Sequence, residues 1–254
     1  MNKNITFKGL KKFNLSMAIL HFIQGLAIVV LSKTYELPIS GSYLGFNPTT
    51  QSLEPITTNL FNMSLPMLIA VFFFICATAH FLIATVYNKE YNDDLGKGLN
   101  KARWIEYSLS ASVMMVAISL LVGIYDLPSL IMIFVLTAIM NLTGLIMEIH
   151  NQTTKKTNWL SFWVGSIAGI IPWVVIAFYM WLASDNGSKA PTFVYWIFVS
   201  IFIFFNCFAV NMVLQYKKIG KWKNYLYGEF MYIVLSLVAK SLLAWQVFAG
   251  TLRP

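Results

Sequence analysis

The stretch YIVLSLVAKSLLAWQVFAG, from Tyr232 to Gly250, decides the fold because it has the length and composition of a membrane-spanning helix. Its one charged residue is Lys240, which is separated from either end of the stretch by about 12 to 15 Å of helical rise. A lysine at the centre of a bilayer costs about 2.5 to 3.5 kcal/mol on insertion scales, so it indicates a functional site. Buried lysine amines commonly form covalent links to carbonyl compounds. The alternative is a packing lysine that reaches the headgroups, for which this depth is unfavourable.

The composition is that of a membrane protein. Of the 254 residues 58% are hydrophobic and 11% charged, against about 25% charged in an ordinary soluble domain. Apolar runs of about 20 residues predict seven spans. The predicted spans are 14–32, 64–86, 103–124, 128–148, 160–183, 192–216 and 227–250.

Seven spans leave no room for an attached catalytic or nucleic-acid-binding domain. We therefore predict an all-α, multi-pass membrane protein in which residues 1–254 form a single seven-helix bundle in the cell membrane. The net charge of +8 then reflects basic residues in the loops that set the membrane orientation, and it is not evidence for binding to nucleic acid.

The distribution of basic residues predicts the orientation. Fourteen Lys and Arg residues fall on the side of the N-terminus and three on the opposite side. By the positive-inside rule, the N-terminus is cytoplasmic and the C-terminus is extracellular. The basic residues assigned to the cytoplasmic side are Lys3, Lys8, Lys11, Lys12, Lys89, Lys97, Lys101, Arg103, Lys155, Lys156, Lys217, Lys218, Lys221 and Lys223, and those assigned to the outer side are Lys33, Lys189 and Arg253.

One connection is long, and it faces outside. Between Lys33 and Met63, partial alternation of apolar residues on either side of Ser40 and Gly41 predicts a small β-hairpin lying over the outer mouth of the bundle. A loop of this length is usually functional or an interaction surface, and the alternative is a disordered linker.

Glu106 is the second charge of interest, at the start of the third span. An acid near an apolar run requires a cation, and Lys240 is the one deep cation, so we expect the two to pair. The objection to this pairing is a difference in depth, because hydropathy places Glu106 nearer the cytoplasmic end of the bundle than Lys240. The alternative is an interfacial acid stabilised by the start of the helix.

Polar residues of the first two spans lie at a similar depth. His21 and His80 are each about 10 Å from the cytoplasmic end, and Gln24 is one turn beyond His21. We expect these residues and Glu106 to line a hydrated cytoplasmic-side cavity, although single buried histidines are often structural. Their spacing does not indicate a metal site. Cys76 and Cys207 are interpreted as small packing residues.

The last three spans carry the remaining candidate residues. Ser236 precedes Lys240 by four residues and can hydrogen-bond a nitrogen there. The fifth and sixth spans are dense in aromatic residues, which either pack the bundle or wall a flat apolar ligand. These aromatic residues are Trp163, Trp173, Phe198, Phe202, Phe205 and Phe208.

Three strings resemble the heliorhodopsin branch of retinal-binding rhodopsins. They are Trp104-Ile-Glu106-Tyr107-Ser-Leu-Ser110, Ala168-Gly-Ile-Ile-Pro172-Trp173, and Ile233-Val-Leu-Ser236-Leu-Val-Ala-Lys240-Ser-Leu-Leu-Ala-Trp245-Gln. The similarity runs over nearly the whole chain and includes the long first outer loop. The family is known for a cytoplasmic N-terminus, which the charge count predicts independently.

The resemblance implies a cofactor and residue roles. Lys240 would carry all-trans retinal as a protonated Schiff base, with Glu106 as counterion and Ser236 as a hydrogen-bonding partner. His21, Gln24 and His80 would form a cytoplasmic polar cluster. The implied walls of the retinal pocket are Tyr107, Met140, Gly144, Trp163, Trp173 and Phe205.

The resemblance also implies a function: a non-enzymatic light sensor with a slow photocycle and no net ion transport. It implies a homodimer formed with help from the first outer loop, and an unidentified cytoplasmic signalling partner. The main alternative is a light-driven or light-gated ion transporter on the same chromophore, but we find no acid or histidine within a span on the outer side of Lys240. A membrane enzyme or transporter unrelated to light would leave Lys240 without a chromophore.

Overall fold

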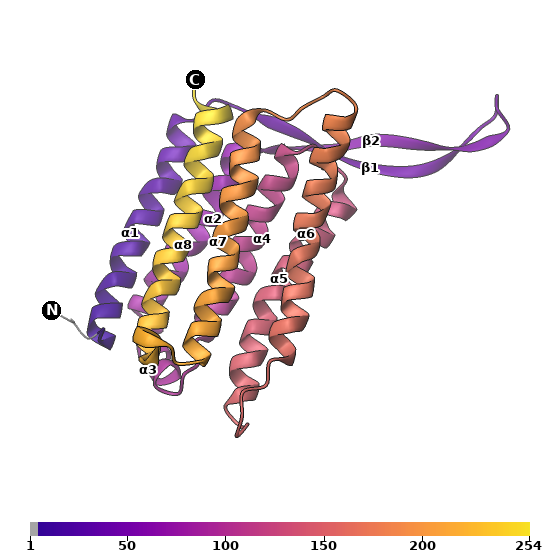
Figure 1. Cartoon of the computed structure of the whole chain (residues 1–254). Coiled ribbons are helices and arrows are strands. Elements are labelled where there is room, and N and C mark those ends of the chain that lie inside the picture. The colour runs from indigo at the N-terminus through magenta and orange to yellow at the C-terminus, as the bar shows by residue number, and fades with distance from the viewer. Residues whose placement is uncertain (1–4) are drawn as a thin grey trace.

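The computed structural model describes residues 5–254, and seven of its helices are long and apolar enough to cross a membrane. They form one upright bundle (Figure 1), which confirms the predicted fold class. The seven helices are α1 (Phe7–Leu31), α2 (Leu65–Ala84), α4 (Lys101–Leu121), α5 (Leu127–Asn151), α6 (Leu160–Asp185), α7 (Thr192–Tyr216) and α8 (Tyr225–Val247). Lys3, one of the basic residues in the charge count, lies outside the described residues.

The helices begin and end within a few residues of the predicted spans, except that α1 begins at Phe7, a turn and a half or more before residue 14. The early residues of α1 are basic, so hydropathy misses them. The side chain of Thr6 caps this helix by accepting a hydrogen bond from the Gly9 amide at 3.1 Å.

Shorter elements complete the chain. Helix α3 (Asn88–Gly96) lies across the end of the bundle that carries the N-terminus, a 3₁₀ helix (Gly220–Lys223) precedes α8, and a π-helical turn (Phe248–Leu252) extends it. The side chains of Asn100, Asp126 and Asn224 cap α4, α5 and α8.

The helices pack in sequence around the bundle. Helix α1 packs on α2, α2 on α4, α4 on α5, and α5 on α6, while α7 packs on α8 and α8 closes the ring against α1. Helices α6 and α7 stand further apart at the backbone, and Trp173 fills the space by contacting Phe202 and Phe205. This wider gap is where the bundle has room for a ligand.

The outer loop forms a long antiparallel hairpin of β1 (Glu36–Asn47) and β2 (Ser52–Ser64). The hairpin exists as predicted, but its turn lies at residues 48–51 instead of at Ser40 and Gly41. The register shifts between Ile39 and Ser40, so the irregularity read as a turn is a β-bulge. At this bulge the Ser40 amide donates to the Tyr125 carbonyl at 2.9 Å, which attaches the hairpin to the α4–α5 connection.

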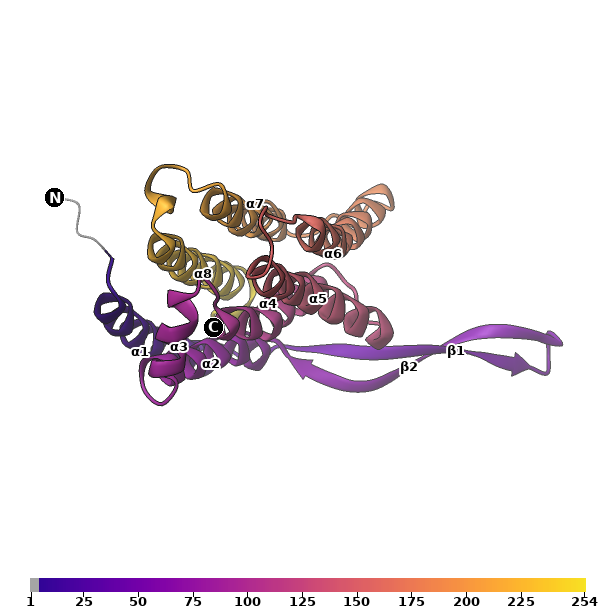
Figure 2. The same ribbon diagram turned by 90° about the horizontal axis from the view of Figure 1, so that it is seen from below.

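The position of the hairpin also differs from the prediction. Figures 1 and 2 show that it projects sideways, well beyond α5 and α6, and does not lie over the mouth of the bundle. Only its base is buried, through Leu37 and Ile39, whereas apolar side chains further out, such as Leu44 and Phe46, are exposed.

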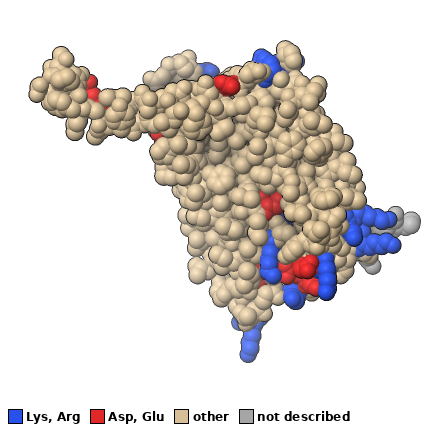
Figure 3. Space-filling model, turned by 180° about the vertical axis from the view of Figure 1, so that it is seen from behind, with Lys and Arg blue, Asp and Glu red and all other residues tan. Residues whose placement is uncertain are grey.

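Most charged side chains gather near the two ends of the bundle, and the face between them is largely apolar with a small acidic patch near its middle (Figure 3). Many large apolar side chains on the outward faces are exposed, as expected for helices surrounded by lipid. The protein is therefore a multi-pass membrane protein.

Candidate functional site

The candidate site is built around Lys240, which lies in the middle of α8 and is 3% exposed. Its Nζ donates hydrogen bonds to Glu106 Oε1 at 2.8 Å and to Ser236 Oγ at 2.7 Å. Ser236 lies one helical turn before Lys240, so α8 itself brings the serine to the amine. The two partners satisfy a charge that would otherwise be costly at this depth.

Glu106 reaches Lys240 from α4. This helix begins at Lys101, two residues before the predicted span, and Glu106 is buried on its inner face. The depth difference seen in the sequence is spanned by the two side chains. The structure thus brings together Lys240, Glu106 and Ser236.

Cys76 is a site residue that sequence reasoning missed. Its Sγ, on α2, donates to Glu106 Oε1 at 2.9 Å, the same oxygen that accepts from Lys240. A single apolar-looking cysteine within a span carries no sequence signal for this contact. The thiol gives Glu106 a second donor that is independent of Lys240.

The two histidines are also brought together. The rings of His21 and His80 stack with centroids 5.5 Å apart, and His80 Nδ1 lies 2.7 Å from Asn14 Oδ1. His21 is fully buried, and within residues 5–254 neither ring nitrogen has a hydrogen-bond partner. Gln24 is not part of this group, because it accepts a hydrogen bond from Trp245 Nε1 at 3.2 Å. Trp245 lies further along α8 than Lys240, away from the end of the bundle that carries the N-terminus.

A second ionic group lies one turn from Glu106 on α4. Arg103 donates to both Glu148 of α5 and Glu229 of α8, and all three side chains are buried. Asn100 binds both acids, through its amide to Glu148 Oε2 at 2.8 Å and through its side chain to Glu229 Oε2 at 2.6 Å. Spacing along the chain does not tell which helix ends meet, so the sequence alone does not predict this group.

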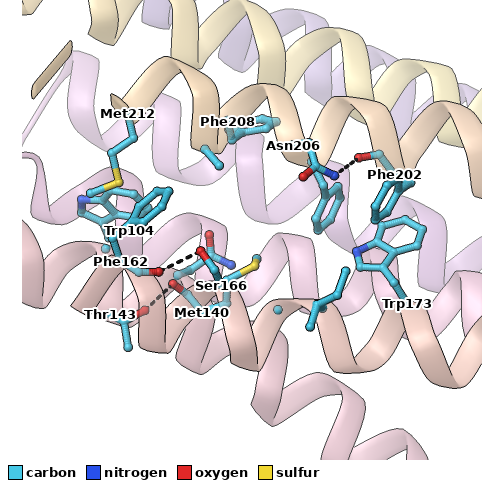
Figure 4. Close-up of a pocket in the computed structure, with 17 residues that line it drawn as sticks. Trp104, Met140, Thr143, Phe162, Ser166, Trp173, Phe202, Asn206, Phe208 and Met212 are labelled. Carbon is cyan, nitrogen blue, oxygen red and sulfur yellow. Dashed lines mark hydrogen bonds between the residues drawn. The ribbon is translucent and has the colours of Figure 1, made fainter. Parts of the chain in front are cut away.

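An apolar cavity of about 150 Å³ lies between α5, α6 and α7. Figure 4 shows that it runs from Trp104 and Phe162 at one end to Trp173 at the other. A smaller cavity of about 50 Å³ is lined by Lys240, Ser236 and Tyr107. The two cavities share four lining residues and so lie next to each other, and together they are called the apolar path. The shared residues are Met140, Asn141, Phe205 and Phe208.

Five of the six predicted pocket residues line this path. Met140, Gly144, Trp173 and Phe205 line the larger cavity, and Tyr107 lines the smaller one.

The prediction for Trp163 is wrong. Its side chain is 63% exposed on the outward face of α6, and its neighbour Phe162 lines the cavity instead. One residue along a helix turns the side chain by about 100°, so an error of one position exchanges inside for outside.

The wall of the cavity depends on close packing between α5 and its neighbours. A Cβ atom at Gly169 would lie 2.2 Å from Met140 Sδ, and one at Gly144 would lie 2.4 Å from the Trp104 ring. Side chains at these positions would push Met140 or Trp104 into the cavity. The glycines therefore keep the path open for a ligand.

No group of three or more His, Cys, Asp or Glu side chains in residues 5–254 has the arrangement of a metal site.

A family model described as Heliorhodopsin matches residues 10–252. The chain belongs to the heliorhodopsin family. The match covers nearly all of the chain, as the resemblance of the three strings implied. No curated protein matches the chain.

The fold has a rhodopsin-like neighbour among solved structures. The crystal structure of a light-driven proton pump from Leptosphaeria maculans matches with a TM-score of 0.64 and 18% sequence identity, over 94% of this chain and 95% of that chain. At this identity the similarity shows the shared fold alone. Membership of the heliorhodopsin family makes the protein a retinal-binding rhodopsin.

The residues of this chain fit retinal. A buried amine lies at one end of an apolar path, and aromatic and thioether side chains form the walls of that path. Trp173 closes the far end through edge-on contacts with Phe198, Phe202 and Phe205 at centroid distances of 5.3 to 5.6 Å. These are the features that a long, flat, apolar aldehyde would need.

Proposed function

We propose that this heliorhodopsin is a light sensor in which all-trans retinal is attached to Lys240 as a protonated Schiff base. The observation that carries the proposal is the position of the Lys240 amine, held between Glu106 and Ser236 at the opening of the apolar path. When bound, retinal supplies absorption of visible light and a light-driven change of shape.

The residues around the amine would each have a distinct task. The Glu106 carboxylate, as counterion, stabilises the positive charge on the nitrogen, and Ser236 accepts a hydrogen bond from it. Cys76 keeps Glu106 oriented when the contact with Lys240 changes. Met140 and Phe205, which border both cavities, would hold the chromophore in line.

We propose a sensor without net ion transport because the buried charges are one-sided. A pump needs proton-exchanging groups on both sides of the nitrogen. Among the described residues, the buried charged and histidine side chains lie at the level of Lys240 or toward the N-terminal end of the bundle. They are His21, His80, Asp94, Arg103, Glu106, Glu148, Glu229 and Lys240 itself.

Orientation and assembly follow the same reasoning. We propose one retinal-binding domain with a cytoplasmic N-terminus, because basic residues are concentrated on that side. The exposed apolar side chains of the hairpin, including Tyr43, Leu44 and Phe46, support a homodimer contact outside the bundle. An unidentified signalling partner would bind on the cytoplasmic side.

The attachment can be tested by mass spectrometry. Protein expressed with all-trans retinal would be reduced with borohydride, which makes the linkage permanent, and then digested and mapped. We expect the added mass on the peptide that contains Lys240, with Lys101, which is half-exposed and paired with Asp94, unmodified. Modification at another lysine, with Lys240 free, would contradict the proposal.

A further inference from the structure

The Arg103 cluster, defined as Arg103, Glu148 and Glu229, carries an unbalanced charge. Each carboxylate oxygen accepts at least one N–H donor: Glu148 from Arg103 and the Asn100 amide, and Glu229 from Arg103, the Asn100 side chain and Gln215. This pattern is that of two ionised carboxylates. With one guanidinium between them, the cluster has a net charge of −1.

This excess charge is buried, since the side chains of both acids are 1% exposed. A buried charge without a partner is costly, and accepting a proton would remove it. The cluster would then consist of one guanidinium, one carboxylate and one neutral acid.

A small cavity connects the cluster to the retinal site. It has a volume of about 20 Å³ and is lined by both Glu106 and Glu229, together with polar side chains including Asn14, His80 and Tyr91. A polar cavity of about 10 to 15 Å³ or more can hold a water molecule. A water there would lie among side chains that include Glu106 and Glu229, and proton transfer can pass through a single intervening water.

We infer that Glu229 is the transient acceptor of the proton that the Lys240 nitrogen releases after light absorption; this inference rests on the proposed function. The N–H bond breaks with its electron pair left on nitrogen, the proton passes by way of Glu106 and the cavity water, and an O–H bond forms on Glu229. The Lys240–Glu106 pair changes from neutral to −1 and the Arg103 cluster from −1 to neutral, so the total charge is conserved.

Other nearby groups fit this role less well. A proton left on Glu106 would stay at the oxygen that lies 2.8 Å from the nitrogen, so it would not leave the pair. His80 borders the same cavity, but its Nδ1 is already 2.7 Å from Asn14 Oδ1 and it lies outside the Arg103 cluster, which carries the excess charge. Glu148 belongs to the cluster but does not line the cavity, so it has no contact with the water.

The return of the proton by the same route explains why nothing need be transported. It also places a change of charge beneath α3, because Tyr91 of α3 lines the cavity. Loss of the charge on Glu229 would weaken its bond to Asn100, which caps α4. The acceptor thus lies where a light signal could reach the cytoplasmic surface.

The test is light-minus-dark infrared spectroscopy of the full chain with retinal, in wild type, Glu229→Gln and Glu148→Gln. We expect a C=O stretching band of a newly protonated carboxylic acid while the nitrogen is deprotonated. The band should be lost in Glu229→Gln. Glu148→Gln keeps the Glu229 carboxylate but leaves it balanced one-to-one by Arg103, so the excess charge is gone and the band should be present but weaker than in wild type. A band unchanged in Glu229→Gln, or no acid band at all, would overturn the inference.

Two further measurements guard against a misfolded variant. The first compares infrared spectra of the retinal-free wild type and Glu229→Gln in the dark, where the variant should lack absorption of an ionised carboxylate. If the variant instead lacks the C=O band of a protonated acid, Glu229 already holds a proton in the dark, and the inference is overturned. Ala79→Val narrows the water cavity without changing a charge, and should slow the rise of the acid band. An unchanged rise would also count against the inference.

The two levels of failure are distinguishable. A wild-type protein without visible absorption would contradict the proposed function itself. Visible absorption and a photocycle, without a proton on Glu229, would contradict only the acceptor.

Discussion

At the scale of single residues, the chemistry depends on one carboxylate shared by two donors. Glu106 Oε1 accepts from Lys240 and from Cys76, so it stays oriented even when one donor moves. Two unit charges about 4 Å apart interact by about 4 kcal/mol at an effective dielectric of about 20, which is enough to influence both colour and proton affinity.

Glu106→Gln removes the charge and keeps the shape. We expect absorption to shift to longer wavelength, because the positive charge on the nitrogen is no longer held in place and spreads along the chromophore. Glu106→Asp, which keeps the charge, should stay close to wild type. Visible spectra of the three proteins check this, and an unchanged spectrum in Glu106→Gln would remove Glu106 as counterion.

The two tryptophans of α6 form a matched pair. Trp173 is 5% exposed and closes the cavity, so Trp173→Ala should shift the absorption and cost about 3 to 5 kcal/mol of stability. Trp163 is 63% exposed, so Trp163→Ala should change stability by less than about 0.5 kcal/mol and leave the spectrum as it is. Spectra and thermal bleaching in one detergent would compare them. Equal changes in spectrum and stability for the two variants would contradict the placement of Trp173 inside the bundle and Trp163 outside it.

At the scale of elements, the sequence predicts where helices lie better than which way they face. Length and hydropathy specify the seven spans. Rotation is harder to predict, because α6 is apolar on all sides and its pattern does not distinguish Phe162 from Trp163. The hairpin turn was misplaced since Ser40 and Gly41 resemble turn residues, whereas the Ser40 contact with Tyr125 makes that position a bulge.

Asn100 is more than a helix cap. Its side chain accepts from the Arg103 amide at 3.0 Å and donates to buried Glu229. Asn100→Ala should therefore reduce the stability of the protein in two ways. Loss of the helix cap should cost about 0.5 to 2 kcal/mol. The Glu229 carboxylate, left with fewer donors in a buried position, should cost about 1 to 3 kcal/mol more. Asn224→Ala, which removes the cap of α8, should lose the cap alone. Thermal bleaching measures both, and equal losses would show that the bond to Glu229 contributes nothing.

The hairpin should be separable from the chromophore site. Replacing residues 43–56 by Asn-Gly joins Ser42 to Thr57, which face each other in the ladder. We expect unchanged absorption and a shift from dimer to monomer, measured by light scattering in detergent. A truncated protein that remains dimeric would assign the dimer contact to the helices.

At the scale of the whole molecule, the one-sided burial of charge predicts a light response without transport. Cells that express the protein with retinal should show no light-driven change in external pH, with or without a protonophore. A change that the protonophore abolishes would contradict the sensor proposal. The Leptosphaeria maculans pump is a suitable positive control of similar fold.

Hydropathy and the charge count predict the overall architecture, and the buried lysine predicts the site. The Arg103 cluster and the Cys76 contact could not be predicted, because the sequence does not mark which helix ends meet or that the cysteine has a polar partner. Such contacts depend on helix rotation and on which ends meet, and neither is encoded in local spacing.

The measurement that tests the central claim most directly is the visible spectrum of the purified protein after expression with all-trans retinal, beside Lys240→Ala. Ser241→Ala, a neighbour that has no hydrogen bond to the Lys240 amine, serves as control. We predict a visible band in the wild type and in Ser241→Ala that is absent in Lys240→Ala. A band that survives in Lys240→Ala, or no band in the wild type, would contradict the attachment of retinal at this residue.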